Sequence, residues 1–186
     1  MPNPTFTVYC GPMFSSKTSR LLMALERCKY QRLPFMAFKP TMDKRYAVGA
    51  IVTHAGWKHP ATNITSGEDL LACVAASLPT PQLVALDEAF MVPGAAAALV
   101  QLFKRGYSIV VSTLDFAANG KPFPEVTQLL AWATHITKCT AVCPVCGRDA
   151  PYTAKKGAGG DEHSVQVGGA ELYEPRCYEH YLAIQE

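Results

Sequence analysis

The chain has 186 residues, of which 49% are apolar and 17% are charged. This composition excludes a disordered polyelectrolyte and is sufficient for one sizeable core, alone or with a small appendage. Lysine and arginine number 17 against 15 aspartate and glutamate residues, so the formal net charge is only +2. Such a balance does not indicate a nucleic-acid surface or an anionic membrane surface, and we expect neither as a partner.

Three features of the sequence bear on where the protein works. The most apolar stretch, residues 89–103, is interrupted by Pro93 and Gly94 and is too short to span a bilayer. Residues 1–4 lack the basic start and the apolar run of a secretory signal. The seven cysteines, an odd number, argue against a secreted disulfide scaffold. We therefore expect a cytoplasmic protein.

Strand-like and helix-like segments alternate along the first half of the chain. The segment 18–31 carries an amphipathic stripe of Leu21, Leu22, Leu25 and Cys28, which predicts a helix. Short apolar strands between such helices predict βαβ units, and hence an α/β fold whose mostly parallel sheet is covered on both faces. The predicted elements, in chain order, are strand 5–10, helix 18–31, strand 34–38, helix 68–77, strand 82–86, helix 95–105 and strand 108–112.

The character of the sequence changes near Lys138. Residues 1–138 contain the alternating pattern, and we predict that they form one α/β domain. Residues 139–186 contain a closely spaced cysteine pair, a glycine-rich stretch at 156–160 and no segment that predicts a helix. We therefore predict a small, loop-rich second unit from residue 139 onward.

The segment that joins the first predicted strand to the first predicted helix resembles a phosphate-binding loop. Such loops read glycine, four residues, glycine, lysine and then serine or threonine, and here Ser16 stands in place of the second glycine. Backbone amides of such a loop bind phosphate oxygens, while Lys17 would reach the β- and γ-phosphates and Thr18 would bind magnesium. A chance strand–turn–helix is the alternative interpretation. The predicted ATP-binding residues are Gly11, Pro12, Met13, Phe14, Ser15, Ser16, Lys17 and Thr18.

Two adjacent acids end the apolar strand predicted at 82–86. Asp87 and Glu88 would lie at the carboxyl end of a parallel strand, where the ligand sites of α/β proteins are found. Alone, the two acids indicate a solvated turn, but beside a phosphate-binding loop they favour metal and acid–base chemistry. Asp87 would bind magnesium, directly or through water, and Glu88 would take a proton from an attacking hydroxyl.

A second set of residues has the spacing of a metal site. Cys143 and Cys146 form a CxxC pair, and Cys177 and His180 form a CxxH pair about thirty residues later. Three thiolates and one imidazole make a closed tetrahedral set that suits structural zinc. A redox CxxC pair is the alternative, but it would not need the second pair. With no open coordination position, the metal would stabilise the small unit rather than catalyse.

Taken together, these motifs resemble the type II thymidine kinases, a family with cytosolic, viral and bacterial members. The resemblance covers nearly the whole chain and depends on the order and spacing of several pieces. These are GPMFSSKT at 11–18, FKPTMDKRY at 38–46, THAG at 53–56, LDEA at 86–89, LD and GKPF between 114 and 123, TAVCPVCG at 140–147 and VGGAELYEPRCYEH at 167–180.

The resemblance implies a RecA-like phosphate-loop domain followed by a zinc-binding domain with a lasso-like loop over the substrate. The implied reaction is transfer of the ATP γ-phosphoryl to the 5′-hydroxyl of thymidine or deoxyuridine, in pyrimidine salvage for DNA synthesis. By position, Lys17 and Glu88 match catalytic residues, with Glu88 as the general base. Asp43 and Arg45 match residues near the phosphates, and Arg45 would stabilise charge on the transferring group. The resemblance also implies a homotetramer.

The nucleoside site is implied by the resemblance alone. The matching residues come from the phosphate loop, from the segment after strand 108–112 and from the covering loop. They are Met13, Leu114, Phe116, Ser164, Val165, Gln166, Val167, Gly168 and Tyr173.

The sequence departs from the family pattern at three places. Ser16 replaces a glycine, the family's Asp-Glu-x-Gln-Phe run lacks its glutamine at 87–91, and Ala118 stands where the family has an aromatic residue, with Phe116 as the substitute. These changes leave open a kinase of a modified pyrimidine deoxynucleoside. The sequence also leaves open an ATP-dependent nucleic-acid enzyme of the RecA-like class and a binding module without catalysis.

Overall fold

The computed structural model describes residues 3–43, 49–156, 168 and 170–185. Its centre is a six-stranded sheet in which every neighbouring pair is parallel, as the alternating pattern predicts. Because all strands run in one direction, their carboxyl ends lie along one edge of the sheet. In spatial order the strands are β5 (Thr62–Ile64), β2 (Phe35–Pro40), β6 (Leu83–Leu86), β7 (Ser108–Thr113), β1 (Phe6–Cys10) and β8 (His135–Lys138).

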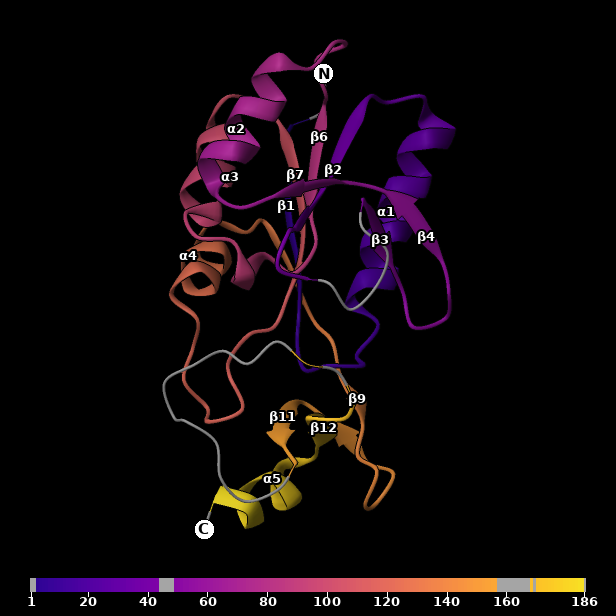
Figure 1. Cartoon of the computed structure of the whole chain (residues 1–186), viewed down its shortest axis with the longest axis vertical. Coiled ribbons are helices and arrows are strands. Elements are labelled where there is room, and N and C mark those ends of the chain that lie inside the picture. Colours follow the sequence, from indigo (N-terminus) through magenta and orange to yellow (C-terminus); the bar gives the residue numbers. More distant parts are fainter. Residues whose placement is uncertain (1–2, 44–48, 157–167, 169, 186) are drawn as a thin grey trace.

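Helices cover both faces of the sheet (Figure 1). The helix α1 (Lys17–Gln31) lies on one face, and α2 (Gly67–Ala76), α3 (Ala95–Lys104) and α4 (Pro124–Trp132) lie on the other. Strand residues alternate accordingly, since Val84 packs in the core beneath the three helices while Ala85 packs in the core beneath α1. None of the described helices combines the length and the apolar character that crossing a membrane would require.

All seven elements predicted from the sequence are present, with ends that differ by two residues at most. The helix α4 was not predicted from the sequence, although proline is common in the first turn of helices and Pro124 stands there. A short hairpin of β3 (Ala50–Val52) and β4 (Lys58–Pro60) packs beside α1, and the single turn η1 (Ala89–Met91) follows β6.

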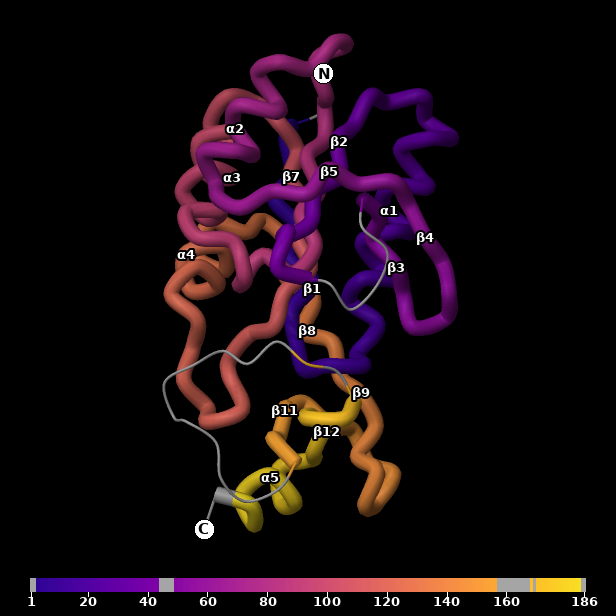
Figure 2. The backbone as a smooth tube through the Cα atoms, in the orientation of Figure 1, coloured from indigo at the N-terminus to yellow at the C-terminus, as the bar shows by residue number. Residues whose placement is uncertain are grey.

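The residues after β8 form a small unit at the carboxyl end of the sheet (Figure 2). The prediction that this unit has no helix is wrong, because α5 begins directly after Cys177. The apolar periodicity of α5 is weak, and Tyr181 is the buried apolar side chain among its described residues. The helix is therefore stabilised by contacts with the rest of the small unit, and not by an amphipathic stripe that the sequence would reveal. The elements of the unit are β9 (Ala141–Val142), β10 (Asp149–Ala150), β11 (Tyr152–Lys155), β12 (Tyr173–Arg176) and α5 (Tyr178–Gln185).

Replacing Gly67 with alanine should destabilise the protein, because α2 and α3 meet there without a side chain between them. A Cβ atom at Gly67 would lie 2.2 Å from the carbonyl oxygen of Gly94 and 3.0 Å from the Cβ of Ala98. We expect a loss of about 2 kcal/mol in the free energy of unfolding, the usual scale of overpacking, measured by urea titration.

Gly106→Ala is the matched control. Gly106 has φ +94°, but a Cβ atom there would meet nothing within 4 Å, so only backbone strain of about 1 kcal/mol is expected. Equal stability of Gly67→Ala and the unsubstituted protein would contradict the close approach.

Candidate active site

The segment between β1 and α1 folds as a tight loop with three residues at positive φ. Gly11 has φ +140°, and a Cβ atom there would lie 2.2 Å from the carbonyl oxygen of Cys139, so only glycine fits. Phe14 and Ser16 have φ 64° and 61°, in the left-handed region that costs residues with a side chain about 1–2 kcal/mol. Ser16 thus takes the conformation that a glycine takes more easily, directly before α1 begins at Lys17.

The Lys17 side chain is buried beneath this loop. Its Nζ atom donates hydrogen bonds to the carbonyl oxygen of Pro12 and, at 3.4 Å, to the Ser15 hydroxyl. Burial lowers the pKa of Lys17, and the negative charges of Glu88 and Asp87 oppose that shift. The ammonium group is therefore held within the loop and beside the two acids that follow β6.

Asp87 links the loop to the sheet. Its Oδ1 atom accepts a hydrogen bond of 3.1 Å from the Thr18 hydroxyl of α1 and another from the Ser112 hydroxyl of β7. Burial, with the neighbouring charge of Glu88, raises the pKa of Asp87 to about 7 despite these two bonds. A cation bound beside Asp87 would favour its charged form. The carboxylate and the Thr18 hydroxyl are oxygen donors of the kind that Mg²⁺ prefers.

Glu88 adopts a left-handed backbone conformation, with φ 51°, at the turn from β6 into η1. Such a conformation is uncommon for a residue other than glycine and often occurs at functional sites. Because the turn places Glu88 beside Asp87 at the carboxyl end of β6, the two carboxylates share one cavity with Lys17.

This cavity has a volume of about 230 Å³. Phosphate-loop residues line part of the cavity, and residues of the hairpin of β3 and β4 line another part, where the His54 ring lies 4.8 Å from that of Phe14. Asp43 also lines the cavity and forms a buried ion pair of 3.5 Å with Lys39. The lining residues are Met13, Phe14, Ser15, Ser16, Lys17, Thr18, Ser19, Asp43, Val52, Thr53, His54, Ala55, Asp87, Glu88 and Leu114.

The residues predicted at the nucleoside site lie at two places among those described. Met13 and Leu114 line the cavity, whereas Phe116 follows β7 with its ring 5.8 Å from that of Tyr152 in the small unit. Ala118 accepts a hydrogen bond of 3.0 Å from the Tyr181 hydroxyl, so this position contacts α5. Gly168 and Tyr173 lie in the small unit. Arg45, Ser164, Val165, Gln166 and Val167 lie outside the described residues.

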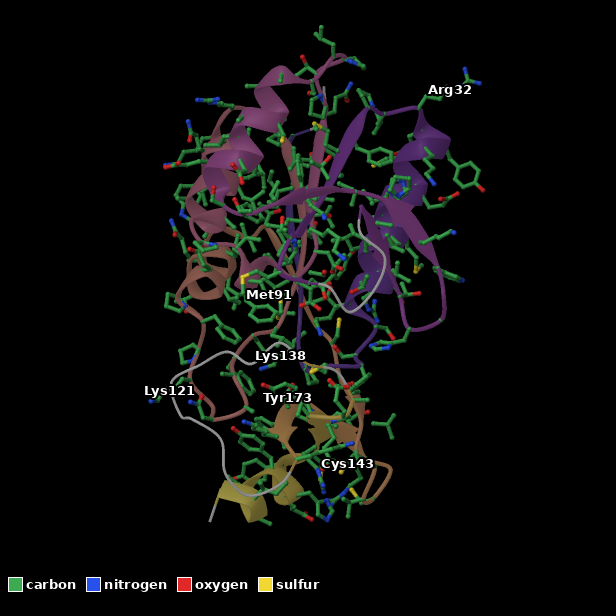
Figure 3. All side chains as sticks on the ribbon, viewed as in Figure 1. Arg32, Met91, Lys121, Lys138, Cys143 and Tyr173 are labelled. Atoms are coloured by element: carbon green, nitrogen blue, oxygen red, sulfur yellow. The ribbon has the colours of Figure 1, made fainter. Side chains whose placement is uncertain are left out.

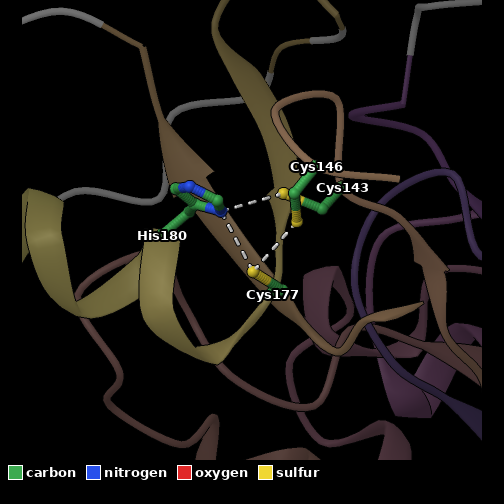
Figure 4. Close-up of side chains that lie close together, drawn as sticks. All are labelled: Cys143, Cys146, Cys177 and His180. Atoms are coloured by element: carbon green, nitrogen blue, oxygen red, sulfur yellow. Dashed lines mark hydrogen bonds between the residues drawn. The ribbon is translucent and has the colours of Figure 1, made fainter. Parts of the chain in front are cut away.

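The four predicted zinc ligands meet in the small unit (Figure 4). Their ligand atoms all lie within 4.8 Å of one another, and the Sγ atoms of Cys146 and Cys177 are 3.6 Å apart. Tetrahedral zinc separates its sulfur ligands by roughly 3.8 Å, so the set fits that ion. The Nδ1 atom of His180 faces Cys143 and Cys177 at 3.7 and 3.1 Å.

The electrostatics of the cluster also suit a metal. Burial acts to raise the pKa of Cys143, but hydrogen bonds from the backbone of Cys177, Val145 and Cys146 lower it to about 6. A thiolate is the form of cysteine that binds metal. The cluster is therefore consistent with a zinc site, as the spacing of its ligands predicts.

The small unit contacts the phosphate loop directly. The Phe14 ring packs against the apolar cluster that contains Cys143 and Cys177. The amide of Met13 donates a hydrogen bond of 3.2 Å to the Thr153 hydroxyl of β11. Two of the loop's residues therefore depend on the small unit for their position.

Several polar residues of the site escaped the sequence prediction, among them Ser19, Thr53 and His54 of the cavity and the supporting residues Ser112 and Thr153. Ser112 ends an apolar run on the strand next to β6, and a hydroxyl at such a position is a signal that could have identified it. Thr153 carries no comparable local signal, since its role arises from the approach of β11 to the phosphate loop.

The sequence also matches a known protein family over most of its length. The family model described as "Thymidine kinase" matches residues 4–181, which is nearly the whole chain.

Replacing Ser16 with glycine should leave the fold unchanged and should strengthen ATP binding or leave it equal. The left-handed conformation at φ 61° is free of strain for glycine, so up to about 1–2 kcal/mol of backbone cost is relieved. Calorimetric titration of ATP into both proteins measures the difference. Clearly weaker binding by Ser16→Gly would mean that the Ser16 hydroxyl contacts the nucleotide, against this account.

Elemental analysis should find about one zinc per chain, since one four-ligand set is present among the residues that the structure describes. Removing the metal by chelation should disorder the small unit, and with it the phosphate loop that Phe14 and Met13 anchor to that unit. ATP binding and circular dichroism, measured before and after zinc is restored, check both effects. Unchanged ATP binding in a metal-free sample would refute the structural role.

Proposed function

The chain belongs to the thymidine kinase family and catalyses the ATP-dependent phosphorylation of thymidine, and we propose here which residues carry out each part of that reaction. The observation that carries the proposal is the Asp87 carboxylate, which joins the phosphate loop through Thr18 to the sheet through Ser112, in one cavity with Lys17 and Glu88. Family membership disfavours an ATP-dependent nucleic-acid enzyme. Deoxyuridine is a second proposed substrate.

Residues 11–18 bind the phosphates of ATP with their backbone amides, at the positive end of α1. Lys17 exchanges its bonds to Pro12 and Ser15 for the β- and γ-phosphate oxygens. Its burial supports this role, because a charge held in a site of low polarity attracts an anion more strongly than an exposed charge does.

Asp87 and Thr18 hold magnesium, either directly or through water. Their oxygen atoms are 3.1 Å apart and face the same cavity as Lys17, which supports a shared cation site. When bound, the ion neutralises charge on the β- and γ-phosphates. Ser112 orients the Asp87 carboxylate from the neighbouring strand, as a second layer of contacts commonly does at metal sites.

Glu88 acts as the general base. It accepts the proton of the 5′-hydroxyl while that oxygen forms a bond to the γ-phosphorus and the bond to the departing ADP breaks. The left-handed turn at Glu88 supports this assignment, since it keeps the carboxylate beside Asp87 at the end of β6. Arg45 stabilises charge on the transferring group, and Asp43 acts near the phosphates, as the family resemblance implies.

The thymine end of the nucleoside binds between Met13, Leu114 and Phe116, beneath the covering loop that contributes residues 164–168, together with Tyr173. Met13 and Leu114 support this assignment because they line the cavity that also holds Glu88. A modified pyrimidine is the alternative base, because Ala118 provides no ring and Phe116 stands in for it.

The proposal also includes a zinc ion, a division into two domains and an oligomeric state. Zinc bound by Cys143, Cys146, Cys177 and His180 stabilises a second domain, 139–186, beside a phosphate-loop domain, 1–138. The protein works as a homotetramer in the cytoplasm, as its family resemblance implies. Sedimentation analysis of the purified chain tests the assembly.

Replacing Glu88 with glutamine should lower turnover by ~10²–10⁴-fold, the usual contribution of a positioned general base, while ATP still binds. Glutamine keeps the shape of the side chain but cannot accept the proton. A coupled assay of ADP release with thymidine measures turnover, and titration measures ATP affinity.

Glu26→Gln serves as the control, because Glu26 forms an exposed ion pair with Lys29 on α1, away from the cavity. Turnover of Glu88→Gln equal to that of the control would remove Glu88 from the mechanism.

A further inference from the structure

Asp115 carries a buried carboxylate that is not among the residues proposed for the phosphoryl transfer, although its charge acts on Lys17. The Asp115 side chain is 8% exposed, and its Oδ1 atom accepts a hydrogen bond of 3.2 Å from the amide of Phe116. Its Oδ2 atom has no hydrogen-bond partner among the described residues, and the Lys138 ammonium lies 3.3 Å away. Since a buried charge is costly unless it is paired, Lys138 is the group that compensates Asp115.

The pair bridges two strands that are not neighbours. In the sheet β1 lies between β7 and β8, and Cys10 at its end is aligned with Thr113 on one side and with Lys138 on the other. Asp115 lies two residues beyond Thr113. The ion pair therefore crosses the end of β1, at the point where the phosphate loop begins.

Both members of the pair also contact Phe116. Asp115 holds its backbone amide, and the Lys138 ammonium lies 5.5 Å from the centre of its ring, within the range of a cation–π contact. Figure 3 shows Lys138 at the carboxyl end of the sheet, with Tyr173 below it in the same view. The ring of Tyr152, 5.8 Å away and tilted by 44°, adds a third contact to Phe116.

The short loop after Phe116 is anchored separately. Its residues close a tight turn, in which the amide of Ala117 donates to the carbonyl oxygen of Lys121 at 2.9 Å. The Tyr181 hydroxyl holds this turn at Ala118. The Phe116 ring itself is half-buried and depends on Lys138 and Tyr152 for its plane.

We propose that Asp115 and Lys138 are positioning residues that fix the Phe116 ring for binding of the pyrimidine base. This inference rests on the proposed placement of the base beside Phe116. The two contacts that the pair makes with Phe116, at the backbone amide and at the ring face, affect the geometry of one ring. Loss of the pair should therefore raise the KM for thymidine and leave the chemical step and ATP binding nearly unchanged.

Steady-state kinetics of Lys138→Gln tests the proposal, with Lys138→Arg as the conservative variant. We expect Lys138→Gln to raise the thymidine KM by roughly 5- to 20-fold, the size typical of a cation–π contact at a partly buried position. The kcat and the KM for ATP should change by about twofold at most, because neither contact involves the phosphate site. Lys138→Arg should restore the thymidine KM, since arginine keeps both the charge and the contact with the ring.

Lys104→Gln is the matched control, because Lys104 lies over the Trp132 ring at 4.6 Å at the end of α3, outside the cavity. If Lys138→Gln folds poorly, Asp115→Asn can be used instead to break the ion pair and test for a raised KM for thymidine. It keeps an oxygen for the Phe116 amide but removes the charge that holds Lys138, so the thymidine KM should again rise.

Phe116→Leu separates the inference from the placement on which it rests. We expect Phe116→Leu alone to raise the thymidine KM, and Lys138→Gln to add no more than about twofold in that background, because both changes act on one ring. A normal KM in Phe116→Leu would overturn the placement of the base. A raised KM in Phe116→Leu, with Lys138→Gln behaving like Lys104→Gln, would overturn the role of the ion pair alone.

Discussion

The parallel pairing of β1 with both β7 and β8 is the constraint on which the site depends. It aligns Cys10 with Thr113 and Lys138, so three strands end together at one edge of the sheet. One end continues into the phosphate loop, one into the segment with Leu114 and Phe116, and one into the small unit. The segments proposed for phosphate and nucleoside binding and the unit with the cysteine–histidine cluster therefore meet at this edge, because parallel strands in this register end together.

The conformation of the phosphate loop also depends on its contacts with the small unit. The unit has a small core, in which the buried residues Ala141, Cys143, Ala150 and Cys177 include two of the four residues that could hold a metal. A unit of this size rarely has enough apolar contact to be ordered without a metal. Because Phe14 packs on that core, the shape of the phosphate loop and the order of the metal cluster are coupled.

Strained backbone is concentrated in the same region. Phe14, Ser16 and Glu88 have left-handed conformations, and each of the three lines the cavity. Strain of this kind persists only where surrounding contacts fix the chain, which the packing of Phe14 and the hydrogen bonds around Asp87 provide. Surrounding contacts therefore hold the loop that we propose binds phosphate through its backbone amides, beside the side chains proposed for the acid–base chemistry.

Local periodicity and spacing along the chain were enough to predict the parallel sheet, the loop at 11–18, the acids at 87–88 and the grouping of Cys143, Cys146, Cys177 and His180. Three sets of contacts could not be predicted in this way: the hydrogen bonds from Ser112 and Thr18 to Asp87, the bond from the loop to Thr153, and the ion pair of Asp115 with Lys138 across β1. The helix α5 belongs to this second group, since its stability comes from contacts with the rest of its unit. All of these contacts join residues that are separated in the chain, and no local pattern encodes the strand order and the packing of the small unit that bring them together.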